Sequence, residues 1–257
     1  MDVIEGIGWE NSEIATGSTI LIRPNQTTPD ADGNTVYADK RVRQALAMAV
    51  DNNICLELGY ANKGAPADNH HAGSMHPEHD PSVGRLPYDP AKAKALMAEA
   101  GMADYEHELI SIDDDWRKNT TDAVAAQLRD AGIKVKRTIL PGSTFWNDWA
   151  KYPFSSTNWN HRPFAVQVWG LAYRSGEAWN EMGWSNAEFD ALLAEANSIA
   201  DADKRRAVAG KCQALIAEEG CTIQPYWRSL YRSHSSSTVC DMHIAYHAHV
   251  YKWGFKA

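Results

Sequence analysis

Hydrophobic positions repeat at helical spacing in the stretch of chain that begins at Asp39. The apolar side chains fall three or four residues apart, on one face of a helix, and they are Val42, Ala45, Leu46, Ala49 and Val50. Asp39 is the expected N-cap, because its carboxylate can accept a free backbone N–H of the first turn. Asp51 is expected to cap a second helix, which contains Ile54 and Leu58.

Residues 61–88 show no such periodicity and are rich in proline and glycine. This pattern predicts a long irregular loop, and loops of this length are usually functional or mobile. A helix is expected to begin at Asp89 and Pro90, which form an N-cap and N1 pair, and to end at Gly101.

Strand and helix patterns alternate after this helix. The expected elements are a strand at 108–112, a helix at 116–131, a strand at 133–140, a short helix after Gly142, a buried strand at 164–170, a helix capped by Asn186, a helix at 203–219 and a strand at 221–227. The alternation predicts an α/β (α+β) fold in which helices pack on a mixed sheet.

The two ends of the chain differ from this middle part. Residues 1–38 and 233–257 contain strand-like pieces but no helix that would cover them. We therefore expect a lobe at 39–232, flanked by two segments that pair with structure outside it.

Charge and composition restrict the classes of function. The formal charge of the 257 residues is −8, and Lys and Arg are scattered between acids, whereas nucleic-acid binding rewards clustered cations. Nucleic acid is therefore not an expected partner. No apolar run approaches the roughly 18 residues that span a bilayer. Asp2, Glu5 and Glu10 occupy the region where an export signal would be basic and apolar, so no signal peptide is expected at Met1.

The four cysteines and the ten tryptophans carry further information. The cysteines lack CxxC spacing, so a structural zinc site is not expected, while one disulfide remains open in an oxidising compartment. Tryptophan favours surfaces that are half apolar and half wet, and we expect about half of the ten to lie at a cleft.

A histidine-rich stretch lies in the long loop. Residues 70–80 contain four histidines, a glutamate and an aspartate, which are side chains that zinc or nickel would accept. Their spacing is not helical and no HExxH motif occurs, so a solvated loop is favoured over a metal site. The histidines near the C-terminus, His243, His247 and His249, alternate nearly as on a strand and are expected to face solvent.

An ester-hydrolase alternative requires a nucleophile with a base in reach. Ser74 lies close to His71 in sequence, and Ser175 follows the tryptophan-rich stretch near His161, so either serine is a candidate nucleophile with a histidine base. Against this alternative, the chain contains no GxSxG motif.

Five segments in order resemble one known family. They are DKRVRQALAMAVD (39–51), YDPAKAKALMAEAG (88–101), AAQLRDAGIKV (125–135), WSNAEFDALLAEA (184–196) and IQPYWRSLY (223–231). The first resembles the D-x-R-V-R-Q-A-L-x-x-A-I-D helix of the extracellular solute-binding proteins of ABC transporters, family 5, the peptide, opine and nickel type.

The resemblance implies a periplasmic-binding-protein-like lobe. Family members are about twice as long as this chain and have two lobes that close on a ligand, so the chain is expected to be the C-terminal lobe with its hinge segments. It implies a periplasmic solute-binding component that receives a small-molecule ligand between lobes and delivers it to an ABC transporter permease, with no cofactor. Without the first lobe the cleft face would be uncovered, so self-association through that face is an open alternative.

The resemblance further places the ligand site near residues 159–177. The expected ligand-binding residues are Trp159, His161, Arg162, Trp169, Tyr173 and Arg174. In relatives that bind free peptides, an aspartate three residues after the tryptophan pairs with the ligand ammonium, and here that position is Ala172. An ordinary dipeptide is therefore a poor expectation, because an unpaired desolvated ammonium costs roughly 3–5 kcal/mol.

Arg162 and Arg174 favour a ligand that carries a negative charge instead of an ammonium. An arginine that faces the cleft would bind a carboxylate or phosphate through two parallel hydrogen bonds, and the ligand would then be a small polar anion of peptide or opine type. The alternative is that both arginines form ion pairs within the lobe, with Glu177 or Asp190.

Overall fold

A six-stranded mixed sheet organises the computed structural model, which describes residues 4, 6–245 and 247–256. The strand order is β2-β6-β1-β5-β3-β4. The strands are β1 (Trp9–Pro24), β2 (Gly64–Pro66), β3 (His107–Ile112), β4 (Val135–Leu140), β5 (Phe154–Trp159) and β6 (Tyr226–Ser235). Strand β1 is antiparallel to β5 and β6, β2 is antiparallel to β6, and β3 is parallel to β4 and β5.

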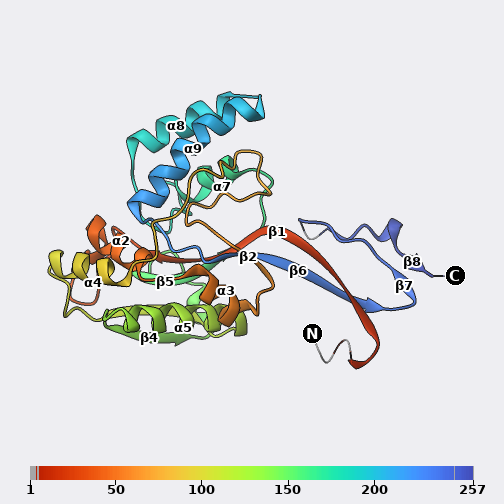
Figure 1. Ribbon diagram of the computed structural model, residues 1–257, viewed down its shortest axis with the longest axis horizontal. Coiled ribbons are helices and arrows are strands. Elements are labelled where there is room, and N and C mark those ends of the chain that lie inside the picture. The colour runs from red at the N-terminus through yellow and green to blue at the C-terminus, as the bar shows by residue number, and fades with distance from the viewer. Residues whose placement is uncertain (1–3, 5, 246, 257) are drawn as a thin grey trace.

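Helices cover both faces of the sheet (Figure 1). One face carries α2 (Lys40–Met48), α3 (Asn52–Tyr60), α4 (Pro90–Glu99) and α5 (Asp115–Asp130), while the other carries α7 (Ala165–Ala172), α8 (Ala187–Ser198) and α9 (Ala202–Glu219). The shorter elements are α6 (Gly142–Phe145), η1 (Val36–Ala38), η2 (Val250–Lys252) and the two-stranded sheet of β7 (Thr238–Val239) and β8 (Gly254–Phe255). A hydrophobic core lies on each face of the sheet, and β1 contributes alternate side chains to both. Ile22 packs with α2–α5 and Leu21 packs with α7–α9.

The predicted caps set the helix starts. Asp39, Asp51, Asp89 and Asn186 each accept a backbone N–H of the following turn. Each such cap is typically worth about 1 kcal/mol, because it satisfies a donor that the helix leaves free. The predicted α/β fold is confirmed, and among the described residues no helix is both long and apolar enough to cross a membrane.

Two expectations about strands are corrected by the structure. The apolar run 164–170, expected as a strand, forms α7, and the strand in this region is β5 at Phe154–Trp159. Residues 19–23, expected to lie uncovered, are at the centre of the sheet between β5 and β6. The chain itself therefore covers this piece.

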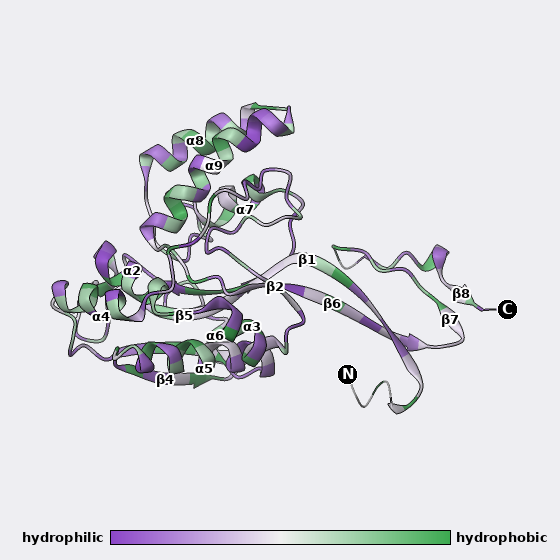
Figure 2. Ribbon diagram, in the orientation of Figure 1, coloured by the Kyte–Doolittle hydropathy of each residue, from purple (hydrophilic) through white to green (hydrophobic). Residues whose placement is uncertain are grey.

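The outer halves of β1 and β6 leave the body of the molecule together. They form a two-stranded ribbon, defined here as residues 9–15 paired with 229–235, which projects away from the helices toward β7 and β8 (Figure 1). Figure 2 shows hydrophobic residues in this outlying part. Tyr251 and Phe255 are exposed there to 78% and 84%, so the distal end presents apolar surface.

Candidate functional site

A row of residues crosses the sheet where the ribbon leaves the body. Trp159 at the end of β5 pairs with Thr19 of β1, Thr19 pairs with Trp227 of β6, and Trp227 pairs with Ala65 of β2. Directly opposed residues of antiparallel strands point to the same face. Both indoles therefore lie on the face that carries α7–α9.

The histidine-rich loop packs onto this row. The His71 ring lies between the two tryptophans, with centroid distances of 6.0 Å to Trp159 and 5.8 Å to Trp227. A Cβ added at Gly73 would lie 2.6 Å from the Trp227 indole, so the backbone approaches that closely only because residue 73 is glycine. The expectation of a solvated loop is wrong, because His70, His71, His76 and Glu78 are all buried.

His76 of the loop and His161, an expected site residue, become neighbours through this packing. The rings of His76 and His161 stack at a centroid distance of 6.3 Å, and His161 Nδ1 accepts the Gly17 N–H at 3.0 Å. Burial lowers the pKa of His76 to about 4 and also lowers the pKa of His161. Both rings are accordingly neutral near pH 7.

A pocket walled by tryptophans opens beside Trp159 and has a volume of about 330 Å³. Its lining consists of Trp146, Trp149, Thr157, Asn158, Trp159, Asn160, Arg162 and Trp179. Trp146 and Trp179 are 42% and 46% exposed, so their rings stand at the rim, and Trp179 meets Trp159 edge-to-face at 5.8 Å. We call this cavity the tryptophan pocket; it combines flat apolar walls with amide and guanidinium groups.

A buried ion pair fixes the floor of the tryptophan pocket. Glu181 accepts hydrogen bonds from Trp159 Nε1 at 2.8 Å and from Thr157 Oγ1, and it pairs with Arg23. Both charged side chains are fully buried. Burial lowers the pKa of Arg23 and the Glu181 carboxylate opposes that shift. The sequence prediction missed both residues, because nothing in their local pattern distinguishes them from surface charges.

The two candidate arginines have different partners. Arg174 pairs with Glu177 at the surface, as the ion-pair alternative predicts. Arg162 lines the tryptophan pocket, and in the described part of the chain no carboxylate lies within ion-pair distance of it. Its Nε is buried without a hydrogen-bond partner among those residues. Among the described residues, Arg162 is therefore a cation at the tryptophan pocket without an acidic partner.

Trp169 and Tyr173 lie elsewhere than expected. Both are fully buried in the core beneath α7–α9, where Trp169 Nε1 donates to the His70 carbonyl at 3.0 Å and the Tyr173 hydroxyl lies 3.2 Å from His71 Nδ1. Neither lines the tryptophan pocket, and neither does Ala172, which is also buried. We therefore leave these residues out of the proposed site.

The two candidate serines are not paired with a histidine in the described part of the chain. Within the described ranges, neither Ser74 nor Ser175 makes a side-chain hydrogen bond to a histidine. Ser175 Oγ instead accepts the Asn186 N–H at 3.2 Å. His71, the expected base for Ser74, directs Nδ1 to the Tyr173 hydroxyl.

The cysteines are unpaired, and three of them are buried. Cys55, Cys212 and Cys221 lie in the interior, Cys240 is partly exposed, and none forms a disulfide in the structure. Burial raises the pKa of the Cys55 and Cys212 thiols to about 12, so both are inert small apolar groups.

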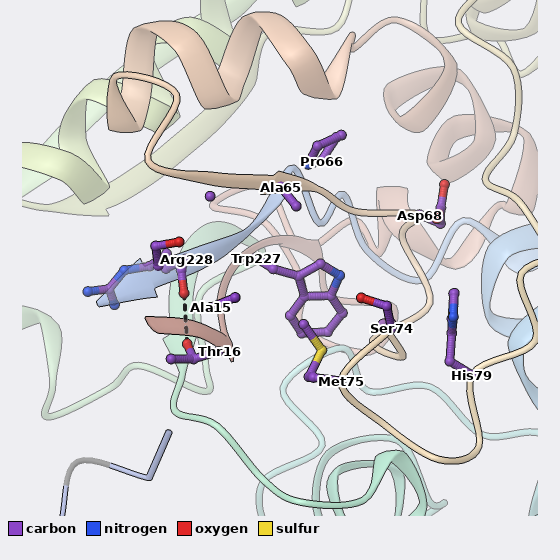
Figure 3. A pocket seen from close by; sticks show the side chains of 13 residues that line it. Ala15, Thr16, Ala65, Pro66, Asp68, Ser74, Met75, His79, Trp227 and Arg228 are labelled. Atoms are coloured by element: carbon purple, nitrogen blue, oxygen red, sulfur yellow. Dashed lines mark hydrogen bonds between the residues drawn. The ribbon is translucent and has the colours of Figure 1, made fainter. Parts of the chain in front are cut away.

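A second pocket of about 240 Å³ lies at the other end of the tryptophan row (Figure 3). Trp227 stands at its centre, with Thr16 and Arg228 on one side and Ser74, Asp68 and His79 on the other. We call it the hinge pocket, because it lies where β1 and β6 pass from the body into the ribbon.

Comparison with known proteins places this geometry in a family. Residues 3–180 match the model of the bacterial extracellular solute-binding proteins, family 5 Middle. Heme-binding protein A of Haemophilus influenzae is 26% identical over 70% of this chain and 35% of its own length. Di/tripeptide-binding protein 3 of Pseudomonas aeruginosa is 26% identical over 79% of this chain and 40% of its own.

Solved structures share the fold over a larger part of the chain. The oligopeptide-binding protein AppA from Bacillus subtilis, solved in complex with a nonapeptide, superimposes with a TM-score of 0.82 at 20% identity and covers 97% of this chain but 53% of its own. The chain thus spans about half of that structure and 35–40% of the curated relatives. Because the family model matches well over half of its residues, the chain belongs to the bacterial extracellular solute-binding proteins of family 5.

Proposed function

We propose that this chain forms one ligand-binding lobe of a solute-binding protein that serves an ABC importer, and that its tryptophan pocket holds a small solute bearing a carboxylate. The observation that carries the proposal is Arg162, a cation at an aromatic pocket with no acidic partner in the described part of the chain. A guanidinium in this position can bind a carboxylate through two parallel hydrogen bonds.

The lining of the pocket supports this ligand class. Three indoles besides Trp159 supply flat surfaces for the body of the solute, while Asn158 and Asn160 offer amide donors and acceptors that would fix its orientation. Among the described residues no carboxylate lines the pocket, so a ligand ammonium would find no counter-charge from them. We therefore infer an anion or a blocked peptide rather than a free cationic amine.

The relatives support a solute-binding role for the whole protein. Their names state binding of heme and of di- and tripeptides, and both kinds of molecule carry carboxylates. By family membership we infer a periplasmic or extracellular location and an ABC permease as the partner. The second wall of the cleft would come from a lobe facing the tryptophan pocket.

Matched pairs of small peptides test the proposal. N-acetylated dipeptides with a free carboxylate are titrated against this chain and the tryptophan fluorescence is followed, alongside the same peptides amidated at the C-terminus. We expect amidation, or the change Arg162→Ala with the free acid, to weaken binding by about 10- to 100-fold, since a charge-assisted hydrogen bond is worth about 1.5–3 kcal/mol.

Arg174→Ala is the matched control, because Arg174 already pairs with Glu177 outside the pocket. It should leave the dissociation constants unchanged. Equal binding of free and amidated peptides, or equal binding by the Arg162→Ala chain, would contradict the carboxylate assignment.

A further inference from the structure

Three potential metal ligands converge at the hinge pocket, apart from the tryptophan pocket. Asp68, His70 and His79 each direct one ligand atom into a group in which all atoms lie within 4.8 Å of one another. In a tetrahedral zinc site, ligand atoms about 2.0–2.1 Å from the metal are roughly 3.3 Å apart. The three atoms therefore need to approach one another by at most about 1.5 Å, which side-chain rotation can supply.

Two of the three ligands have no competing hydrogen-bond partner among the described residues. Asp68 and His79 are partly exposed, and neither side chain makes a hydrogen bond to the described part of the chain. Figure 3 shows both on the same side of the hinge pocket. A carboxylate and an imidazole that make no hydrogen bond within the described ranges can coordinate an ion that arrives from solvent.

The third ligand, His70, is fully buried and held by two long hydrogen bonds. Its Nε2 lies 3.2 Å from the Val83 carbonyl, and its Nδ1 accepts the Ala72 N–H at 3.4 Å. Coordination through Nδ1 replaces the hydrogen bond from Ala72, while the Nε2–H continues to donate to the Val83 carbonyl and to orient the ring.

The surrounding loop is fixed rather than mobile. The His70 carbonyl accepts the Trp169 indole N–H, and the Asn69 side chain accepts the backbone N–H of Gln224 at 2.8 Å. The Glu78 carbonyl accepts from Gln213 Nε2 of α9 at 3.1 Å. Both ends of the cluster are thus tied to separate elements, which gives a site held ready for an ion.

We propose that Asp68, His70 and His79 bind a Zn²⁺ ion, which ties the two ends of the histidine-rich loop together beside the hinge. Two imidazoles and one carboxylate are a ligand set that suits zinc, and three protein ligands leave a fourth position open. Asp68 and His79 line the hinge pocket, from which water or a donor atom of a bound solute could reach the ion. Mg²⁺, which prefers oxygen ligands, is not expected to bind.

A second group of histidines must be separated from this one in any test. His243, His247 and His249 also bring three ligand atoms within 4.8 Å of one another, in the segment between β7 and β8. The parent for the test is therefore the full chain with all three replaced by alanine. Zinc affinity is measured by competition with a chromophoric chelator, and the melting temperature is recorded with and without Zn²⁺.

We expect this parent to bind one equivalent of Zn²⁺ and to melt at a higher temperature in its presence, because the ion binds the native state alone. His79→Asn and Asp68→Asn, each added to the parent, should weaken zinc binding at least about tenfold. Asp80→Asn is the matched control, since Asp80 neighbours His79 but accepts its hydrogen bonds from Ser82. It should bind zinc as the parent does.

Both test variants are checked for folding by circular dichroism in the presence of a chelator. Asp68→Asn preserves the shape of a side chain that makes no hydrogen bond to any described residue. A parent that binds no zinc would overturn the proposal. So would zinc binding at parental affinity in both His79→Asn and Asp68→Asn.

Discussion

Glu181 and Arg23 show how much of the tryptophan pocket depends on two residues that do not line it. The Glu181 carboxylate orients Trp159 and Thr157, and the fully buried Arg23 guanidinium balances its charge. A buried pair of this kind adds little net stability over an apolar pair of the same volume, but losing one partner leaves the other charge buried and uncompensated. The pair is therefore sensitive to single substitutions.

Replacing Glu181 by glutamine should cost about 3–5 kcal/mol of the free energy of unfolding, because the amide keeps an acceptor for Trp159 but leaves the Arg23 charge unopposed. Urea denaturation measures the loss. Glu177→Gln, which removes the partner of the exposed Arg174, should cost no more than about 1 kcal/mol. Similar losses for the two variants would contradict the role of the buried pair.

Sequence reasoning located part of this site at the residue scale. Two of the expected ligand residues, Trp159 and Arg162, line the tryptophan pocket, whereas Glu181 gave no signal because its partner Arg23 lies far away in sequence. The histidine-rich loop was misjudged for a related reason. Polar composition predicts exposure, but here Trp159 and Trp227 pack against the loop and a hydrogen bond from α9 ties its backbone to the body of the protein.

At the scale of elements, the packing of α3 against α5 depends on one glycine. A Cβ added at Gly59 of α3 would lie 2.8 Å from the Thr120 Cα and closer still to the Thr120 hydroxyl of α5. A backbone atom cannot move out of the way as the end of a side chain can. The two helices approach this closely only because residue 59 has no side chain.

Gly59→Ala should therefore lower the free energy of unfolding by about 1–3 kcal/mol, since overpacking outweighs the gain in helix propensity. Chemical denaturation gives the value. Gly170→Ala is the control: Gly170 lies within α7 and a Cβ there meets no atom within 4 Å. This change should be neutral or stabilise by up to about 1 kcal/mol. A neutral Gly59→Ala would show that the helices can separate without cost.

Helices and strands could be predicted where caps and periodicity agreed. The prediction failed where a segment was short. The capped helices α2, α3, α4 and α8 begin where the sequence places them. The run 164–170 is apolar and contains two valines, so it resembles a buried strand, and its eight-residue helix is too short for periodicity to decide. Strand β5 was missed because its buried centre is Ser155, Ser156 and Thr157.

At the scale of the whole molecule, burial of histidines sets the response to acid. His107 packs against Tyr37, Tyr105 and Phe154, with Nδ1 3.1 Å from the Tyr37 hydroxyl, and burial lowers its pKa to about 4. The ordinary pKa of about 6.5 applies in the unfolded chain, which therefore takes up the proton first as the pH falls. This contribution to stability is complete above about pH 6.5 and is lost between about 6.5 and 4.

His107→Gln should make the fall in stability across that pH window shallower, by up to about 1.4 kcal/mol per pH unit. Urea denaturation at several pH values between 4.5 and 7.5 measures the slope. The exposed His247, replaced by glutamine, controls for the loss of a histidine as such. An unchanged slope in His107→Gln would mean that His107 does not resist protonation in the native protein.

The strands that carry Thr19 and Trp227, β1 and β6, extend from the body into the projecting ribbon. Its seven paired positions on β1 reach roughly 20 Å beyond the body, at about 3.3 Å per residue. The irregularity between Ala15 and Ser18 lies at its base, where the Gly17 N–H meets His161 and a Cβ would lie only 2.8 Å from that ring. The ribbon thus joins the body at the backbone that contacts His161. A displacement of its distal end would act on the segment that holds this imidazole.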